Sequence, residues 1–411
     1  MSESRQALEF QTHASFTHRL VLSTLTGRPI KIRNIHADSP TNPGLAPHEV
    51  SFLRLLDAVT NGGNFEISYS GTLIAYRPGL ITGSAAGSGA SRGVVRHELE
   101  ENCTRGVSYF LIPLCLLAPF SKAPFNVLFT GPGVITAATP AGDVSVDTVR
   151  TAILPLYERF GISNNIELRI LRRSCAGSSG EGGAGEVQLV FGHQVRLPKT
   201  IHLLNAGRVK RIRGVAYCTG VSASNNARMI EAARGVLNPL AADTYIFSDV
   251  SSAPYIDSSK SSSAAGDDAP RKRKIGLGFG LSLVAESSTG ALFSADVVSP
   301  PSGGTPPEDL GRTAAFQLLD NVSAGGCVSR TGALTMLTLM AMGSEDVGRL
   351  RVGRKVLGEA EEVIRLARDL SKFGASQWGL RDAGDNESEG EGDVVVSVVG
   401  RGIGNVGRKV A

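Results

Sequence analysis

The sequence predicts an α/β protein made of three related helix-over-sheet units, with a smaller α/β domain inserted before the third unit. Three observations predict this class. A helical pattern that ends at glycine, followed by strand patterns, occurs three times along the 411 residues. A composition of 42% hydrophobic and 19% charged residues is typical of a globular chain. The 49 glycines suggest many tight turns between short elements.

The first unit is predicted from a helix and two strands. The helix is expected because apolar residues recur at i, i+3, i+4 and i+7 and two glycines follow. The residues of this pattern are Phe52, Leu55, Leu56 and Val59, then Gly62 and Gly63. Side chains alternate over 64–70, and the chain turns at Ser70-Gly71 and returns over 72–77. These two segments predict a hairpin.

The second unit repeats the pattern. A helix is expected to begin near Asp143 or Ser145 and to end at Gly161. Its apolar face is formed by Val149, Ile153, Leu156 and Phe160. The segments 166–173 and 186–191 then predict two strands joined by a glycine-rich loop.

The third unit and the insertion complete the series. In the third unit a helical stripe ends at Gly374, and residues 393–399 predict a strand. The stripe consists of Val363, Leu366, Leu370 and Phe373. In the insertion, strands are expected at 209–221, 244–250 and 275–287, and a helix at 226–237.

These elements predict a division of the chain into three parts. Residues 1–187 hold the first two units, 188–287 the inserted domain and 288–411 the third unit. Three segments of low complexity are expected to be mobile loops. They are the Gly/Ser-rich 82–93, the polar 258–274 and the acidic 384–393.

Charge and cysteine content limit the classes of function. A net charge of +4 and a pI near 8.8 permit contact with nucleic acid but do not require it. The five cysteines include no CxxC pair, so we expect reduced thiols and neither a disulfide framework nor structural zinc. The polar start is no signal peptide, and no apolar run reaches the length of a membrane span, so a soluble protein is expected.

Several segments resemble the RNA 3′-terminal phosphate cyclase family. TGRPIKI (26–32), NPGLAPHEVSFLRLL (42–56) and YRPG (76–79) are similar to the opening of these enzymes. The likeness continues, in order, through LPLYERFGI (154–162), GGAGEV (182–187), RIRGVAY (211–217), PPEDLG (306–311) and GSEDVGRLRVGRK (343–355). The resemblance covers nearly the whole chain. It implies units similar to the C-terminal domain of translation initiation factor three.

Within this family, the chain resembles the eukaryotic cyclase-like branch. The similarity is carried by NPGL and HEVSFLRLL, by PFSKAPF (119–125) and by EDVGRL (345–350). It implies a factor of nuclear and nucleolar ribosome biogenesis, working in the small-subunit processome on the route to 18S rRNA. The implied partners are the GTPase Bms1, pre-rRNA and the U3 snoRNP within the pre-ribosome. No cofactor, membrane or small-molecule substrate is implied.

Three departures from the cyclase pattern predict that catalysis is lost. Cyclases open with a motif of the form EGGGQ, whereas residues 9–20 contain no glycine, which close approach to nucleotide phosphates needs. His36 replaces the first arginine of an IRAGR-like segment. The nucleophilic histidine would fall near 347–355, yet all seven histidines lie at or before His202. Guanidinium groups remain protonated and cannot replace that nucleophile. We therefore predict no catalytic residues and no metal site.

Three sets of charged residues are candidate contacts for RNA or a partner. The first is the run Arg349, Arg351, Arg354 and Lys355, at the expected mouth of the former cyclase cleft; the alternative is a solvated turn. The second is Arg365, Arg368 and Lys372, on one helix face flanked by Asp369; the alternative is stabilisation of the helix dipole. The third is Arg271, Lys272, Arg273 and Lys274, a nuclear-import or polyanion patch or simply a soluble loop.

Other motifs leave alternatives open. The loop 177–187 lacks the Lys-Ser/Thr of a phosphate-binding loop and is more simply a hairpin turn. His48 and Glu49 beside Pro-Gly-Leu could serve acid–base chemistry, or could lie at the start of a helix after a turn. The main alternative function is a pre-rRNA endonuclease. Metal-free cleavage would require folding to bring a histidine beside a cation cluster. A cyclase with an altered site is the third alternative.

Overall fold

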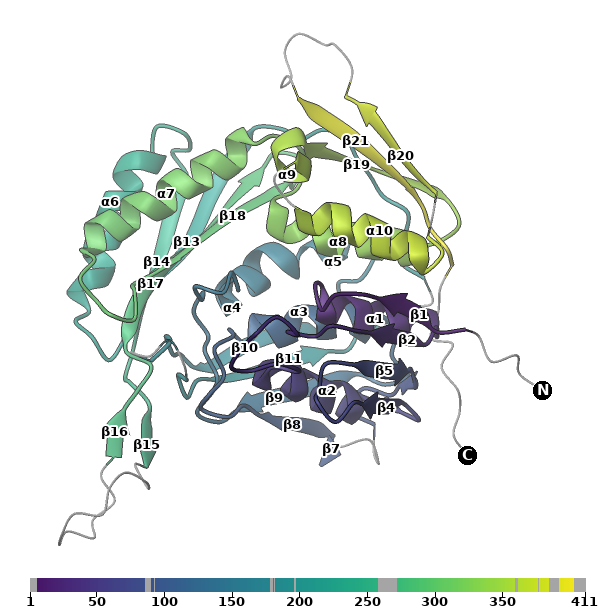
Figure 1. Ribbon diagram of the computed structural model, residues 1–411. Coiled ribbons are helices and arrows are strands. Elements are labelled where there is room, and N and C mark those ends of the chain that lie inside the picture. The colour runs from purple at the N-terminus through teal and green to yellow at the C-terminus, as the bar shows by residue number, and fades with distance from the viewer. Residues whose placement is uncertain are drawn as a thin grey trace, which may run out of the picture.

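The computed structural model of the protein describes residues 6–85, 90–91, 93–177, 180, 182–195, 197–257, 272–358, 361–375, 377–383 and 392–402. It is a mixed α/β structure of several sheets with helices packed on them, as predicted (Figure 1). All five cysteines are buried, and none of them is in a disulfide bond. In the part of the chain that is described, none of the helices is both long and apolar enough to span a membrane.

The first sheet has the strand order β1-β2-β5-β4. β1 runs parallel to β2, and the pairs β2–β5 and β5–β4 are antiparallel. Its elements are β1 (Leu8–Phe10), α1 (Phe16–Thr26), β2 (Ile30–Ile32), α2 (Pro47–Val59), β4 (Asn64–Ile67) and β5 (Ile74–Arg77). A short pair, β3 (Thr60–Asn61) and β6 (Leu80–Ile81), lies beside it. The helix and hairpin expected from 52–77 are therefore present.

The second sheet has the order β10-β11-β9-β8-β7. The strands β8 and β9 are parallel, and β11 is antiparallel to both β9 and β10. Its elements are β7 (Ala90–Ser91), β8 (Val94–Glu98), α3 (Ser108–Leu117), η1 (Ala118–Phe120), β9 (Phe125–Thr130), α4 (Val146–Thr148), the π-helical segment η2 (Val149–Ile153), α5 (Leu156–Arg159), β10 (Ile166–Arg172) and β11 (Glu186–Phe191). Ser145 caps α4, because its side chain accepts a hydrogen bond from the backbone N–H of Thr148.

The third sheet has the order β12-β19-β21-β20. Again the first pair is parallel and the next two are antiparallel. Its elements are β12 (His202–Leu203), α8 (Arg330–Met342), β19 (Val347–Gly353), α9 (Arg354–Gly358), α10 (Glu361–Lys372), β20 (Trp378–Asp382) and β21 (Asp393–Val399). β21 coincides with the predicted strand. The second sheet shows the same pattern from β8 through β9 and β11 to β10, and its fifth strand, β7, adds one antiparallel pair with β8. The three sheets thus share a core of four strands with one parallel and two antiparallel pairs.

The inserted elements form a fourth sheet of order β14-β13-β17-β18. They are β13 (Val209–Thr219), α6 (Ser224–Leu237), β14 (Thr244–Ser251), β15 (Tyr255–Asp257), β16 (Lys272–Lys274), β17 (Gly278–Ser287), β18 (Leu292–Val298) and α7 (Pro307–Ser323). Helices α6 and α7 cover one face of this sheet, and the β15–β16 hairpin extends away from it (Figure 1). The predicted strands and helix of the insertion are confirmed.

Strand pairing crosses the domain boundaries that the sequence predicts. The boundary at 187/188 falls inside β11, which pairs with β9 and β10 over its length. The boundary at 287/288 separates β17 from β18, although these two strands pair from Gly280 to Glu286. Sheet membership therefore extends the insertion through α7. The boundaries are displaced because the pattern of apolar residues marks elements but not their partners.

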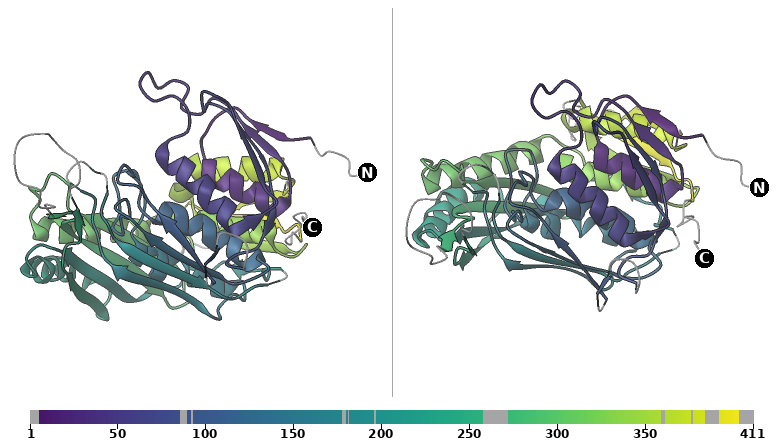
Figure 2. Two further views of the ribbon diagram at one scale, coloured as in Figure 1. Left: turned by 90° about the horizontal axis from the view of Figure 1, so that it is seen from below. Right: turned by 60° about the horizontal axis from the view of Figure 1, so that its bottom comes forward.

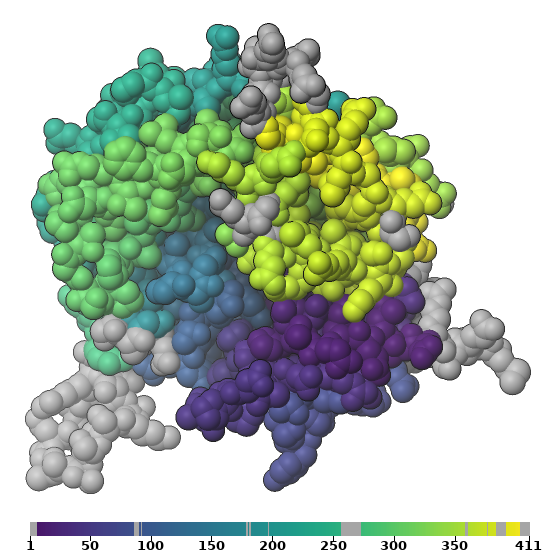
Figure 3. Space-filling view, turned by 45° about the horizontal axis from the view of Figure 1, so that its top comes forward, coloured from purple at the N-terminus to yellow at the C-terminus, as the bar shows by residue number. Residues whose placement is uncertain are grey.

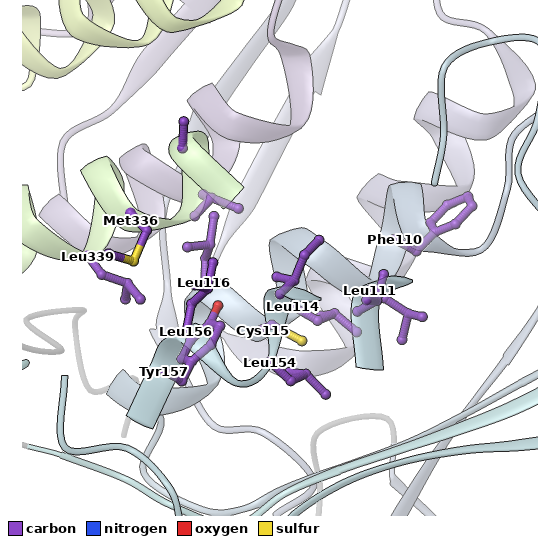
Figure 4. Packing of buried hydrophobic residues seen from close by; sticks show 14 of the residues in the cluster. Phe110, Leu111, Leu114, Cys115, Leu116, Leu154, Leu156, Tyr157, Met336 and Leu339 are labelled. Carbon is purple, nitrogen blue, oxygen red and sulfur yellow. The ribbon is translucent and has the colours of Figure 1, made fainter. Parts of the chain in front are cut away.

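The helices of the three units pack against one another between the sheets (Figures 1 and 2). α1 and α10, from opposite ends of the chain, are in contact, and α3 touches both α1 and α8. Figure 4 shows the side chains of α3 meeting Tyr157 and Leu156 of α5 and Met336 and Leu339 of α8. The sequence SYFLIPLCLL of α3 is apolar on all sides, as expected of a helix enclosed by others. It shows no helical period, so the sequence pattern did not predict it.

Of the three loops expected to be mobile, two lie mainly outside the described residues. These are 258–271 of the second loop and 384–391 of the third. In the first loop, Thr82 and Ser84 are buried and Ser84 bonds Asn126, so its beginning belongs to the packed structure.

Candidate functional site

A cleft of about 700 Å³ lies where all three units meet. It is lined by residues 13–18, by the starts of α2, α3 and α8, by the loop 141–144 and by one side of α10. In Figure 3 the purple, blue and yellow-green surfaces of these segments meet on one face of the molecule. Several helices begin at this cleft, and the N-terminal end of a helix dipole attracts negative charge.

The N-terminal wall of the cleft contains two stacked histidines. The ring centroids of His13 and His36 are 3.9 Å apart, and the backbone N–H of His36 donates to Nδ1 of His13 at 3.3 Å. The Nε2 atom of His36 lies 3.2 Å from Oε2 of Glu49, at ion-pair distance but not aligned for a hydrogen bond. Glu49 is buried and accepts a hydrogen bond from the backbone N–H of Ala46 at 2.9 Å, which closes the capping box of α2.

The next wall is built around Tyr109 at the start of α3. His48 meets this ring edge-on at 5.2 Å, and the guanidinium of Arg105 lies over it at 4.4 Å. Arg105 in turn donates from Nε to Oδ2 of Asp143 at 2.7 Å. Burial, reinforced by the charge of Arg105, lowers the pKa of His48 to about 4. His48 is therefore a neutral imidazole at neutral pH, able to accept a proton or a hydrogen bond.

His18 closes the cleft towards the third unit. Burial lowers its pKa, while the carboxylates of Glu362 and Asp369 act in the opposite direction. Its Nε2 atom is buried and has no hydrogen-bond partner among the described residues. On the same side, Arg330 pairs with Glu362 at 3.3 Å and Arg365 with Glu361 at 2.7 Å. Histidines from the N-terminal half thus face cations from the C-terminal half.

The backbone at Ser15 is unusual for a residue with a side chain. Ser15 precedes α1 with φ 57°, in the left-handed region that favours glycine. It lines the cleft within the stretch 9–20, where cyclases carry glycines. A left-handed turn at this point of the cleft is therefore occupied by a residue that has a Cβ.

The described residues do not offer a metal centre. No group of three or more His, Cys, Asp or Glu side chains within them is arranged to hold a metal ion. The cleft brings together imidazoles, guanidinium groups and the buried carboxylates of Glu49, Asp143 and Asp369. Such groups can form hydrogen bonds, bind anions and transfer protons.

The predicted face of α10 is divided by the structure. Arg368 and Lys372 are exposed, and Nζ of Lys372 lies 4.8 Å from the ring of Phe10. Arg365 lines the cleft. Asp369, in contrast, is 4% exposed and is held by Arg19, whose Nε donates to Oδ2 at 2.7 Å. Its side chain is unavailable to a partner, because α1 packs on α10 at this point.

The predicted basic run on β19 and α9 is also divided. Arg349 and Lys355 are exposed, whereas Arg351 is 8% exposed and donates to Asp393 at 2.6 Å. Arg354 pairs with Asp382 at the surface. None of these four residues is in the lining of the cleft of about 700 Å³, and their position at the mouth of a former cyclase cleft stays a prediction. The run belongs to the third sheet, whereas α8 and α10 form that side of the cleft.

Three residues of the basic quartet, Lys272 to Lys274, form β16. Arg271 is outside the described residues, and Lys272 begins β16. Arg273 is exposed and pairs with Glu101 at 3.0 Å, and Nζ of Lys274 lies 5.6 Å from the ring of Tyr255. A role in nuclear import or polyanion binding stays a prediction.

Comparison with known proteins identifies the class. The family model described as RNA 3′-terminal phosphate cyclase matches residues 8–375. The chain therefore belongs to the RNA 3′-terminal phosphate cyclase family.

Its relatives include members of the cyclase-like branch. The chain is 36% identical to the "rRNA processing protein rcl1" of Schizosaccharomyces pombe, over 98% of this chain and 99% of that protein. It is 37% identical to the human "RNA 3′-terminal phosphate cyclase-like protein", over 99% of both chains. It is 36% identical to the "rRNA processing protein RCL1" of Saccharomyces cerevisiae, over 98% of this chain and 97% of that protein. The resemblance inferred from the motifs is confirmed.

Proposed function

We propose that this protein is a non-catalytic factor of rRNA processing. It works in the nucleolus, in the small-subunit processome on the way to 18S rRNA, and acts by binding the GTPase Bms1, pre-rRNA and the U3 snoRNP. The support comes from relatives of nearly equal length whose names state rRNA processing, at 36% identity. The sequence departures from the cyclase pattern support the absence of catalysis.

One observation of the site carries the non-catalytic part. The segment that corresponds to the glycine-rich nucleotide motif places side chains of His13, Ser15 and His18 at the cleft. A glycine there would let the backbone approach a phosphate closely, but these side chains stand between backbone and cleft. The place expected for the nucleophilic histidine, 347–355, lies on the third sheet outside the cleft lining.

Incubation with labelled ATP and divalent cations tests this part directly. We expect no covalent AMP on this protein, while an authentic RNA cyclase assayed in parallel forms an adduct. An adduct that is lost in hot acid, as a phosphoramidate is, would contradict the proposal.

Affinity purification from nuclear extract at moderate salt tests the assembly role. We expect one large GTPase together with U3 snoRNA and pre-rRNA. Recovery of the protein alone, or with unrelated RNAs, would contradict this role. Because Arg368 and Lys372 are exposed on α10, they are the proposed contacts, together with Arg349 and Lys355.

A pre-rRNA endonuclease is the second candidate, and one observation favours it. Folding brings His13, His36 and His48 into the same cleft as Arg105 and the arginines of α8 and α10. In metal-free RNA cleavage a neutral imidazole can act as a general base, and guanidinium groups can bind the phosphate and stabilise its developing charge. Cleavage of a pre-rRNA fragment by the purified protein in EDTA, abolished by His48→Ala, would establish this activity and overturn the non-catalytic proposal.

We further infer that the three units are repeats of one fold similar to the C-terminal domain of translation initiation factor three. The support is their common order of one parallel and two antiparallel strand pairs.

A further inference from the structure

Two aromatic side chains stand exposed on the edge strand β14. Tyr245 is 56% exposed and Phe247 is 55% exposed, and their ring centroids are 4.6 Å apart at 73°. The alternate residues Thr244 and Ile246 are buried on the side of α6. Two neighbouring rings that point away from the core of their own sheet contribute little to its folding. Such surface rings commonly mark a binding site.

The open part of this sheet is limited to β13 and β14. On the same face, β17 and β18 are covered by the second unit, where Thr148 Oγ1 lies 2.9 Å from Ser282 Oγ and Ser145 Oγ donates to Asp296 Oδ1 at 2.8 Å. The opposite face carries α6 and α7 (Figure 1). The result is a four-stranded sheet with two helices behind it and aromatic rings in front. RNA recognition motifs share this layout, although not this topology, and stack bases on such rings.

A cleft of about 410 Å³ opens beside Phe247. Its apolar part is formed by Val215 and Val284 of the inserted sheet and Ile170 of β10. Its charged part consists of three arginines and two aspartates: Arg150, Arg173, Arg213, Asp147 and Asp249. This size falls in the range of roughly 300–1,000 Å³ found for small-ligand sites. An apolar slot with a guanidinium rim suits a planar base linked to phosphates.

The charges around the rings favour a polyanion. The cations are Arg150, Arg173, Arg208, Lys210, Arg211 and Arg213, and the carboxylates are Asp147, Asp243, Asp249 and Glu286, six against four. Each of these carboxylates is paired with one of the four arginines Arg150, Arg173, Arg211 and Arg213, so the excess of positive charge comes from Arg208 and Lys210. Arg208 and Lys210, at the beginning of β13, make no ion pair with any described residue. The hydrogen bond from Arg213, and then the charges of Arg211 and Lys210, hold the pKa of Asp243 below its usual value, so these cations lie close to the start of β14.

We propose that the face formed by β13 and β14 binds single-stranded RNA. One base stacks on Phe247 at the cleft and the next on Tyr245, while phosphates contact Lys210, Arg213 and Arg150. The cation rim favours RNA over an apolar peptide. The inference rests on the proposed function only in that it takes RNA as the partner.

Fluorescence anisotropy with a labelled oligouridine of about 12 nucleotides, at low salt, tests this proposal on the full chain. We expect Tyr245→Ala and Phe247→Ala each to weaken binding about 5-fold to 100-fold. Phe247→Tyr keeps a ring and should bind like the wild type. The matched control is Phe316→Ala, because Phe316 is 54% exposed on α7, behind the sheet, and its loss should change nothing. Lys210→Ala should reduce the slope of log K against log salt by about 0.7.

Two results would overturn the proposal. One is equal RNA affinity of the wild type, the double alanine variant and Phe316→Ala, or no binding by the wild type. The other is a double variant that binds RNA normally but loses a protein partner from nuclear extract, which would make this face a protein-docking surface. Circular dichroism of each variant checks that it is folded. If the alanine variants do not fold, Phe247→Tyr remains as the test, and loss of RNA binding by this folded variant would contradict stacking on the ring. The two proposals can fail separately. If RNA binding depends on the rings but the protein does not co-purify with pre-ribosomes, the assembly role is contradicted and the RNA-binding site is not.

Discussion

Replacing Asp369 by asparagine should destabilise the protein strongly, although the sequence suggested a surface residue. The ion pair between Arg19 and Asp369 joins α1 to α10 across 350 residues of chain. The guanidinium donates to both carboxylate oxygens, at 2.7 and 3.3 Å, and its Nη1 donates to the carbonyl of Thr12 at 2.6 Å. The two side chains are 7% and 5% exposed. Asp369→Asn keeps the shape but leaves the charge of Arg19 buried without its partner.

The expected cost follows from this burial. Removing one member of a buried ion pair costs about 3–5 kcal/mol, because the remaining charge keeps its desolvation penalty. For a chain of this length that unfolds as one unit, the unfolding entropy is about 0.9 kcal/mol/K, so Tm should fall by roughly 3–6 °C. Removing one member of a surface ion pair should lower the stability far less. Asp382, which is 80% exposed and pairs with Arg354, should cost at most about 1 kcal/mol when changed to asparagine.

Thermal unfolding followed by circular dichroism, with urea unfolding as a second measurement, distinguishes the two cases. Asp369→Asn and Asp382→Asn remove the same charge and differ only in burial. If both variants melt within 1 °C of the wild type, the reasoning from burial fails. Arg19→Met combined with Asp369→Leu should recover much of the loss, because a buried ion pair is often replaceable by apolar side chains.

Two further predictions concern partner binding and pH. Arg368→Glu should weaken co-purification of the GTPase without lowering Tm, since Arg368 is exposed. Arg312→Glu on α7 is the control. If both variants recover as much GTPase as the wild type, the α10 face is only a solvated surface. Burial, with the charge of Arg54, lowers the pKa of His97 to about 4, so the unfolded state binds more protons below pH 6.5. His97 should therefore contribute a loss of roughly 3 kcal/mol in stability as pH drops from 6.5 to 4. In urea unfolding, His97→Gln should reduce the pH dependence by about this amount and leave the contribution of His48.

Local periodicity explains which elements could be predicted. The stripe Val363, Leu366, Leu370 and Phe373 is at most 3% exposed in α10, and the predicted helix ends at Gly374 with φ 96°. Such stripes report the 3.6-residue repeat of a helix whatever surrounds it. α3 escaped prediction because nearly all of its residues are apolar, as it packs against α1, α8 and the second sheet, and an all-apolar segment shows no such repeat.

The candidate site could not be read in the same way. His48 and Glu49 follow a turn, and their position at the start of α2 is what the simpler interpretation expected. Their importance appears only when His13 and His36 come alongside from other loops. The spacing of these histidines along the chain does not indicate a site. The residues that complete the cleft come from helices that are distant in the sequence.

The sequence by itself determined the α/β class, most strands and helices of the repeated pattern, the family, and the absence of histidine from the C-terminal half. These properties depend on residue identity and on the short-range geometry of helices and strands. The tertiary structure decided which charges are surface and which are core: Asp369 and Arg351 are enclosed, while Arg368 and Arg349 remain free of the core. It also decided that Tyr245 and Phe247 are exposed, because β14 is an edge strand whose outer face the second unit leaves open. Burial of a charge depends on which element packs over it, and residue spacing along the chain does not encode that contact.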